Sequence, residues 1–314
     1  MERDKGVSVK TMETYSEKFA EQGYLVVKSV LHEADLAPLI AVVSDVVDRR
    51  ATELYNEGVI SDTYENLPFE HRWHAILKAC DRENEVFGWH TLVFSEALFH
   101  LITHPKVLDI LASLIGSDIQ FNGDFWVRPK LPNEKLTTLP WHQDSAYMPE
   151  TENDTHLTVW LPLVDVKLEN GPLQFLPGSH KLGLQTYHRV PGEAFAIPVL
   201  SPTSSDTDID TLKMKKGDLL VFNNLVFHRS LVNHSDGIRW STDFRFSRTG
   251  TSLNGLWHEA IACPVREREA INVPHHGRCG VPNGKPVRTK TDSFNPPPRF
   301  PVLKIGCIST FFML

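Results

Sequence analysis

The first third of the chain has apolar residues at the spacing of helices. Apolar or aromatic side chains recur every three or four positions from Met12 to Gln22 and from Ala34 to Tyr55, which predicts two helices with one buried face each. The β-branched and aromatic run Tyr24–Val27 predicts a short strand. Two more helices are expected from Phe94 to Gly116. They separate at His104-Pro105, because proline is well placed at a helix start and poorly placed inside a helix.

From about Asp118 the pattern changes to strands. Short apolar and β-branched runs alternate with glycine, proline, asparagine and aspartate, which is typical of an all-β sandwich or barrel. The predicted strands cover 119–127, 157–164, 173–176, 218–222 and 241–246. The expected fold class is therefore mainly β with flanking helices.

Composition narrows the classes of partner. The 314 residues include 39 Asp+Glu and 32 Lys+Arg, for a net charge of −7, and 41% of them are hydrophobic. This apolar content is enough for a packed core. An acidic chain without a basic block is not expected to bind nucleic acid or an anionic membrane. Since no apolar run reaches about 18 residues, no membrane span is expected either.

Cysteine and histidine differ in what they offer a metal. The 4 cysteines are scattered and form no CxxC pair, so neither a disulfide framework nor a thiolate metal site is expected. There are 15 histidines, so a metal site would consist of imidazole and carboxylate groups. His275-His276 beside Cys279 lacks a second ligand pair at zinc-finger spacing, and we do not expect zinc there.

Two segments of the predicted β region carry metal-ligand chemistry. His142 and Asp144 are two residues apart, and in a strand such residues face the same side. His228 follows the buried run that begins at Gly217-Asp218 and could supply a third ligand. Two histidines and a carboxylate on one face of the metal suit Fe(II) and leave three positions for substrates. Zinc with the same ligands is the chemical competitor.

Arg239 follows His228 by eleven residues. A guanidinium group near such a site suits a dicarboxylate co-substrate, because it binds a carboxylate with two parallel hydrogen bonds. The spacing alone equally allows a surface arginine beside Asp236 or Asp243.

An ordered set of motifs resembles the phytanoyl-CoA dioxygenase family of Fe(II)- and 2-oxoglutarate-dependent oxygenases, from roughly Gln22 to Thr249. The motifs are Trp141-His142-Gln143-Asp144, Trp160-Leu161-Pro162-Leu163, Glu169-Asn170-Gly171-Pro172-Leu173, Leu176-Pro177-Gly178-Ser179-His180, Gly217-Asp218-Leu219-Leu220, and His228 through Asn233 to Arg239. The resemblance implies a double-stranded β-helix, a cupin-like jelly roll of two packed sheets preceded by helices.

The resemblance also implies roles for individual residues. His142, Asp144 and His228 are expected to bind Fe(II), and Arg239 to pair with the distal carboxylate of 2-oxoglutarate. The expected lining of the co-substrate pocket is Gln143, Trp160, Ser230 and Ser179. The strand before His142 offers three candidates for a further pocket contact, and the sequence does not choose among Asn122, Phe125 and Arg128. Tyr147 is a candidate to face the prime substrate.

The implied activity is oxidation of a small, apolar organic metabolite. It requires Fe(II), dioxygen and 2-oxoglutarate, with ascorbate as a candidate reductant, and it releases succinate and CO2. Hydroxylation, desaturation and rearrangement are not distinguished. Halogenases of the family replace the carboxylate ligand by a small residue, so an intact Asp144 favours oxygenation. The N-terminal helices and loops 150–155 and 190–210 are expected to shape the substrate pocket.

Two other classes stay open. A cupin-type hydrolase or isomerase would use zinc or manganese without 2-oxoglutarate, and it would have no need of Arg239. A non-catalytic binding protein on the same fold would have no need of an intact set of metal ligands.

The organisation predicted is one catalytic domain over 1–272. It comprises a mostly helical part (1–117), a jelly-roll core with the metal site (118–249) and a closing segment (250–272). Residues 273–314 are expected to form a poorly defined tail, since 282–301 is rich in proline, lysine and arginine. The start lacks the apolar region of a secretory signal, and the end does not match a peroxisomal tripeptide. We therefore expect a cytoplasmic protein. The expected oligomeric state is a monomer or homodimer.

Overall fold

The computed structural model describes residues 9–81, 88–147, 154–189, 196–198, 209–252 and 261–267. The chain divides into Met1–His275 and His276–Leu314, and every described residue belongs to the first unit. The predicted tail, His275-His276 and most of loops 150–155 and 190–210 lie outside the described residues. The division of the domain into three segments stays a prediction.

The helices of the described residues precede most of the strands in sequence. They are α1 (Val9–Gln22), α2 (Glu33–Asn56), α3 (Phe69–Ala79), α4 (Trp89–Leu92), α5 (Glu96–Ile102) and α6 (Pro105–Ile115). Apolar periodicity predicts α1, α2, α5 and α6, including the break at His104, which is the N-cap of α6. It does not predict α3 and α4 individually, because helices of 11 and 4 residues contain few repeats of the pattern.

The strands form a six-stranded sheet in the order β1-β8-β3-β10-β2-β11, a three-stranded sheet in the order β7-β4-β9, and a β5-β6 pair. Their bounds are β1 (Tyr24–Val27), β2 (Ile119–Lys130), β3 (Leu157–Pro162), β4 (Leu173–Phe175), β5 (Tyr187–Arg189), β6 (Ala196–Pro198), β7 (Asp210–Thr211), β8 (Leu219–Asn223), β9 (His228–Ser230), β10 (Arg239–Arg248) and β11 (Cys263–Arg266). Their pairings are antiparallel, and the sheets are curled, with helices alongside. The predicted jelly roll is confirmed.

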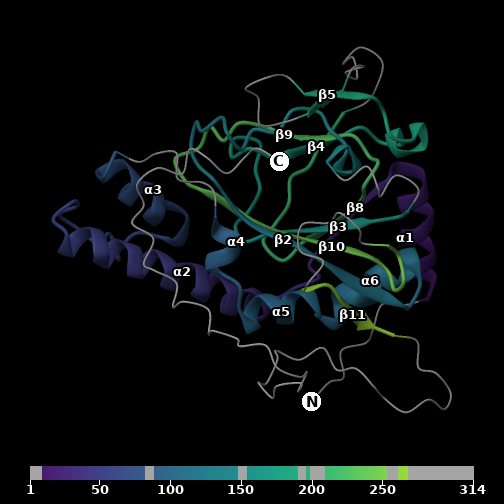
Figure 1. Ribbon diagram of the computed structural model, residues 1–314, viewed down its shortest axis with the longest axis horizontal. Helices are drawn as coiled ribbons and strands as arrows, with labels where there is room; N and C mark the ends of the chain where they lie inside the picture. Colours follow the sequence, from purple (N-terminus) through teal and green to yellow (C-terminus); the bar gives the residue numbers. More distant parts are fainter. Residues whose placement is uncertain are drawn as a thin grey trace, which may run out of the picture. The chain divides into compact units, whose positions relative to one another are not determined.

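One face of the six-stranded sheet packs against helices. Figure 1 shows α5 and α6 on this side of the sheet, and β4 and β9 of the three-stranded sheet on the other. Successive side chains of a strand face opposite sides, so alternate residues of the central strands enter the helical core. Phe121, Leu157, Val159, Phe244 and Phe246 belong to that core and are between 0% and 2% exposed.

The opposite face of the same sheet, here called the inner face, is polar along β10 and yet buried. On β10 it carries Arg239, Ser241, Asp243, Arg245 and Ser247, all between 0% and 8% exposed. The register pairs Arg239 with Lys130 of β2, and Asp243 with Trp160 of β3. Because buried charges require partners or ligands, the chemistry of the protein is expected on this face.

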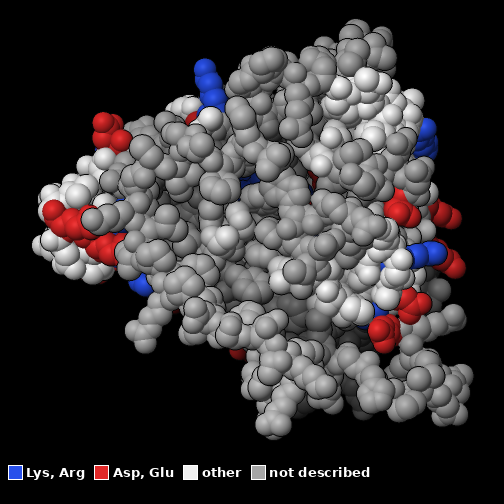
Figure 2. Space-filling view, in the orientation of Figure 1, with Lys and Arg blue, Asp and Glu red and all other residues white. Residues whose placement is uncertain are grey.

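One stretch, Glu96–Ile115, is apolar and long enough to cross a membrane by length and composition alone. It consists of α5 and α6, which bury apolar side chains in the core. Helices in the core of soluble proteins can have the same length and apolar composition, so this stretch is weak evidence for a membrane span. On the face drawn in Figure 2, acidic and basic side chains of the described residues are interspersed.

Candidate metal centre and co-substrate pocket

His142, Asp144 and His228, here called the triad, come together from three different local structures. His142 forms an isolated antiparallel bridge with His228, the first residue of β9, through backbone hydrogen bonds of 2.9 and 3.0 Å. Asp144 begins the short 3-10 helix η1 (Asp144–Ala146). The expectation that His142 and Asp144 share a strand face is therefore wrong. His228 follows the buried strand β8, as expected, but it starts β9, a strand of the second sheet.

The triad offers one ligand atom from each side chain, all within 4.8 Å of one another. Among the described residues, it is the one group of three or more His, Cys, Asp or Glu side chains that could hold a metal ion. Asp144 Oδ1 lies 3.8 Å from His142 Nε2 and 3.5 Å from His228 Nε2. Nδ1 of His142 bonds the Pro140 carbonyl at 2.8 Å, and Nδ1 of His228 bonds the Val226 carbonyl at 3.0 Å. With Nδ1 as donor, each Nε2 keeps a lone pair for a metal.

The protonation states of the triad also suit a metal. The three side chains are between 3% and 6% exposed. Burial and the neighbouring His228 lower the pKa of His142 to about 3, and burial also lowers the pKa of His228. Burial favours the neutral form of Asp144, but Arg245 and the two histidines outweigh it and lower the pKa of this carboxyl to about 2. At neutral pH the site therefore has one carboxylate and two neutral imidazoles, as metal binding requires.

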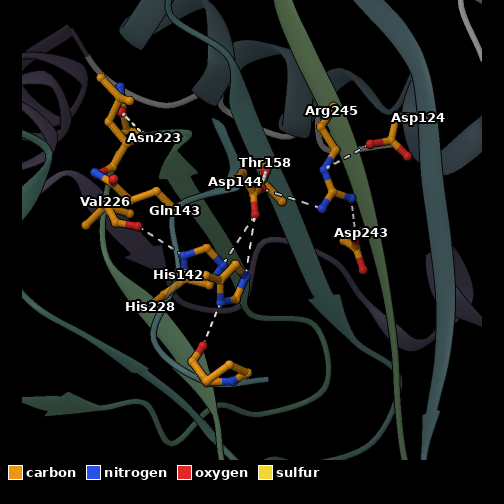
Figure 3. A network of polar contacts seen from close by, with 12 residues as sticks. Asp124, His142, Gln143, Asp144, Thr158, Asn223, Val226, His228, Asp243 and Arg245 are labelled. Carbon is orange, nitrogen blue, oxygen red and sulfur yellow. Dashed lines mark hydrogen bonds and ion pairs between the residues drawn. The ribbon is translucent and has the colours of Figure 1, made fainter. Parts of the chain in front are cut away.

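The second carboxylate oxygen of Asp144 is held from the side away from the histidines (Figure 3). Thr158 Oγ1 donates to Oδ2 at 2.7 Å, and Arg245 Nη2 lies 3.5 Å from the same oxygen. Because Oδ2 is held in this way, Asp144 presents Oδ1 to a metal. The motifs do not identify Thr158 or Arg245.

Arg245 joins three carboxylates on the inner face, as Figure 3 shows. Besides Asp144 it pairs with Asp243, and its Nε lies 3.5 Å from Asp124 Oδ2. Asp243 in turn accepts from Arg128 Nε at 2.8 Å. The sequence pattern that could have located Arg245 is the alternation of polar and apolar residues along β10 from Arg239 to Arg248.

Arg239 lies at the start of the same polar row. It is 4% exposed, so the alternative of a surface arginine is wrong. Its Nη1 donates to Ser241 Oγ at 3.0 Å, its guanidinium lies 5.2 Å from the centre of the Trp160 ring, and its buried Nε has no hydrogen-bond partner. Trp160 pairs across the sheet with Asp243, which follows Arg239 on the inner face of β10. Burial lowers the pKa of Arg239 to about 9.

Lys130 lies beside Arg239, although the motifs do not identify it. It is 1% exposed, and its Nζ donates to Ser230 Oγ and to the Thr137 carbonyl, both at 2.7 Å. Burial, followed by the charge of Arg239, lowers the pKa of Lys130 to about 6. Gly171 leaves room for this lysine, because a Cβ there would lie 2.6 Å from Lys130 Cε, and its φ of +78° also favours glycine.

A sequence profile of the phytanoyl-CoA dioxygenase family matches residues 19–241, well over half of the chain. The chain belongs to this family. It is thus an oxidoreductase of the Fe(II)- and 2-oxoglutarate-dependent oxygenase type. The donor set of the triad fits Fe(II), and the unpaired donor of Arg239 beside Lys130 fits a carboxylate of 2-oxoglutarate.

Individual relatives agree with the assignment to the phytanoyl-CoA dioxygenase family. A probable phytanoyl-CoA dioxygenase of Caenorhabditis elegans is 24% identical over 272 residues, which cover 82% of this chain and 84% of that protein. A probable alpha-ketoglutarate-dependent hypophosphite dioxygenase of Stutzerimonas stutzeri is 26% identical over 250 residues, covering 76% and 78%. The fold is similar to that of the epimerase SnoN in complex with Fe3+, alpha ketoglutarate and nogalamycin RO, with a TM-score of 0.54, 20% identity and coverage of 92% and 97%.

Two residues of the family motifs, Gln143 and Ser179, form hydrogen bonds with backbone groups of loops. Gln143 Nε2 donates to the carbonyls of Gly183 and Leu225 at 2.9 and 2.6 Å, and its Oε1 accepts from Gln185 N at 2.9 Å. Ser179 Oγ donates to the Leu176 carbonyl and accepts from Phe227 N. These bonds give both residues a part in holding loops, and their predicted contacts with 2-oxoglutarate stay predictions.

The four candidates for further pocket contacts differ in where they lie. Phe125 is 3% exposed and packs with Phe121 in the helical core, so it does not face the inner side, and its proposed pocket contact is wrong. Asn122 and Arg128 lie on the inner face, where Arg128 pairs with Asp243. Tyr147 lies edge-on to His142, with ring centroids 5.8 Å apart. For Asn122, Arg128 and Tyr147, contact with a ligand stays a prediction.

Proposed function

We propose that His142, Asp144 and His228 bind Fe(II), and that Arg239 and Lys130 bind the distal carboxylate of 2-oxoglutarate. The enzyme then oxidises a small, mainly apolar organic metabolite, with hydroxylation as the expected outcome. Succinate and CO2 are the products of the co-substrate.

The observation that carries this proposal is a buried pair of basic side chains, Arg239 at the start of β10 and Lys130 at the end of β2. Arg239 and Lys130 are 4% and 1% exposed, and among the described residues neither has an ion-pair partner. The Nε of Arg239 lacks any hydrogen-bond partner. The unpaired buried guanidinium group of Arg239 is destabilising, so a resident anion is expected there, and Lys130 in its protonated form can pair with the same anion. We expect a dicarboxylate to supply it and also to reach the triad, because Arg239 shares the inner face of β10 with Arg245, which contacts Asp144.

Each group of residues has a distinct task in the proposed reaction. Bound Fe(II) supplies the activation of dioxygen that is coupled to decarboxylation of 2-oxoglutarate. Thr158 and Arg245 hold Asp144 as a ligand with a single oxygen, which leaves other positions of the metal for co-substrate and dioxygen. Arg239 and Lys130 fix one end of the co-substrate. The burial of the triad excludes water, which protects a reactive centre from side reactions.

The alternative functions account for fewer of these contacts. A cupin-type hydrolase or isomerase with zinc or manganese would use the triad but would leave Arg239 and Lys130 without an anion. A non-catalytic binding protein would not require the tautomers that both histidines adopt. We therefore favour the oxygenase.

The substrate is less defined than the reaction. Relatives include enzymes named for phytanoyl-CoA and for hypophosphite, which have little chemistry in common, so family membership names no substrate for this chain. We propose a small molecule as the partner. A cytoplasmic location and a monomeric or homodimeric state stay predictions.

Absorption of the anaerobic protein tests the proposed function. The purified full-length chain receives Fe(II) and 2-oxoglutarate without oxygen, and the weak visible band of 2-oxoglutarate bound to Fe(II) is expected. Admission of oxygen should then yield succinate. Arg239→Ala should not reach the wild-type band at the 2-oxoglutarate concentration that saturates the wild type. If the wild type shows neither the band nor succinate, the proposal is wrong.

A further inference from the structure

The polar inner face continues past the triad. Beyond Arg245, the next inner-face residue of β10 is Ser247, which is 0% exposed. It bonds Asn122 of β2, which in turn bonds His156, the residue directly before β3. Asn122 and His156 are 0% and 2% exposed. None of these three residues has a part in the proposed binding of iron or 2-oxoglutarate, so this buried cluster needs another explanation.

A backbone carbonyl determines the direction of every hydrogen bond in the cluster. Gln120 Nε2 donates one proton to the carbonyl oxygen of Thr251 and the other to Ser247 Oγ, both at 3.0 Å. Ser247 is thus an acceptor from Gln120 and gives its own proton to Asn122 Oδ1 at 2.8 Å. Since the oxygen of Asn122 is used in this way, its amide nitrogen faces His156.

This order of donors fixes the tautomer of His156. Asn122 Nδ2 lies 2.9 Å from His156 Nδ1, so Nδ1 accepts and carries no proton. The proton of the neutral ring is then on Nε2, which is buried and has no hydrogen-bond partner. Burial lowers the pKa of His156, in agreement with a neutral ring. A buried N–H donor without an acceptor is destabilising until a ligand or a water pairs with it.

The location of this donor relates it to the prime substrate. Arg239 is at the start of β10 and Ser247 near its end, and Arg245, which contacts Asp144, lies between them. His156 lies two residues before Thr158, the other partner of Asp144, and its bond with Asn122 places its ring on the inner-face side of the sheet, where Thr158 also lies. With 2-oxoglutarate on the Arg239 side of the triad, the molecule to be oxidised would lie on the His156 side.

We propose that His156 Nε2–H, oriented by Asn122 and Ser247, binds an uncharged oxygen acceptor of the prime substrate, such as a carbonyl or hydroxyl oxygen. This inference rests on the proposed oxygenase function and narrows its substrate class to metabolites that carry such an oxygen near the oxidised carbon. A hydrocarbon would leave the donor unpaired, and an ammonium group has no lone pair to offer. An anion is disfavoured because the ring is neutral and the negative charge of Asp154 reaches it.

Three cyclohexane derivatives test the class of acceptor: cyclohexanone, protonated cyclohexylamine and cyclohexanecarboxylate. The full-length protein, loaded with Zn(II) and saturated with 2-oxoglutarate, is titrated with each while NMR follows the Nε2–H resonance that His156→Leu lacks. Cyclohexanone is expected to shift this resonance and to bind most tightly of the three. If the ammonium compound binds equally well, or the carboxylate binds more tightly, the inference is overturned.

Two variants of His156 separate the donor from the space that the ring fills. His156→Gln keeps an N–H group near the position of Nε2, whereas His156→Leu has none. We expect cyclohexanone to bind His156→Leu about twofold to tenfold more weakly than wild type, and His156→Gln nearly as well as wild type. Equal affinity in all three proteins, or no response of the wild-type resonance, means that water pairs with Nε2, and the inference fails.

Binding of 2-oxoglutarate is measured separately in the same proteins. The anaerobic Fe(II) forms of the wild type and both variants are expected to show the visible band at similar 2-oxoglutarate concentrations. Absence of the band in the wild type contradicts the proposed function. A normal band without a preference for the ketone contradicts the His156 inference alone.

Discussion

The two faces of strand β10 are equally buried but differ in chemistry. On β10, Phe244 and Phe246 enter the helical core, while Asp243 and Arg245 alternate with them on the inner face, where Arg245 contacts Asp144, and all four are at most 8% exposed. One strand thus serves stability with one set of alternate residues and chemistry with the other. The apolar face is stable without any ligand, whereas the polar face holds cations and donors that a ligand has to complete.

The largest effect is expected beside the inner face, on removal of a metal ligand. His228→Ala leaves two of the three ligands, and succinate formation should fall by roughly 1,000-fold or more, because loss of a catalytic group removes most of the rate enhancement. The measurement is succinate release after oxygen is admitted to the protein with Fe(II) and 2-oxoglutarate. His234→Ala, at an exposed position, is the control and should stay near wild type. If the two variants behave alike, His228 is not a ligand.

A substitution on the helical face should lower the stability of the protein and leave ligand binding unchanged. Phe246 is 0% exposed, so Phe246→Ala should lower the free energy of unfolding by about 3–5 kcal/mol, as measured in urea. The fraction that stays folded should bind 2-oxoglutarate as the wild type does. Leu168→Ala, where the side chain is 58% exposed, should change stability by less than about 0.5 kcal/mol. A large loss of 2-oxoglutarate affinity in folded Phe246→Ala would show that the two faces are not independent.

Lys130 should make 2-oxoglutarate binding depend on pH. Its pKa of about 6 in the free protein leaves the amine mostly neutral at pH 8. A bound carboxylate favours the ammonium form and raises this pKa, so binding above pH 6 takes up a proton. The affinity should therefore fall as the pH rises above 6, by up to about tenfold per pH unit.

Lys130→Met provides the comparison for this pH effect. The variant should bind 2-oxoglutarate more weakly than the wild type at pH 6 and should lose the pH dependence between pH 6 and 8. Lys167→Met, with 64% of its side chain exposed in the wild type, should keep it. An unchanged pH profile in Lys130→Met would assign the dependence to another group.

The smallest effect is expected from Thr158. Thr158→Val keeps the shape of the side chain but removes the hydrogen bond to Asp144 Oδ2, so Fe(II) affinity should fall by about tenfold. Thr242→Val is the matched control, because Thr242 is also buried on a central strand but donates to the Trp126 carbonyl on the opposite face. The measurement is the Fe(II) affinity of both variants by titration. Equal affinities would show that the hydrogen bond of Thr158 does not support the metal site.

The features of the fold and of the candidate site that depend on local spacing could be predicted from the sequence. The periodicity of α2 and the break at Pro105 appear within single segments, and the motif residues His142, Asp144 and His228 do come together in the fold. Their assignment to iron and that of Arg239 to 2-oxoglutarate stay proposals. The reason given for the convergence of the first two, a shared strand, was nevertheless wrong, because Asp144 begins a 3-10 helix.

The parts that depend on pairing between distant strands could not be predicted. Lys130 meets Arg239 through the register of β2 and β10, which shifts at an irregularity between Phe244 and Phe246. The spacing of residues within one segment does not predict that Lys130 and Arg239 lie side by side. The tautomer of His156 likewise depends on hydrogen bonds from β2, β10 and the turn after it.

Gly171 gives the family motif that contains it a physical meaning. The atom that a larger residue would add there overlaps Lys130 Cε and also lies 2.7 Å from the Leu231 carbonyl oxygen. The amine of Lys130 can therefore enter the interior because a hydrogen stands where every other amino acid has a carbon. A residue without charge or polarity thus affects where the amine of Lys130 lies, so its replacement would alter co-substrate affinity through Lys130, although glycine itself has no side chain to bind the co-substrate.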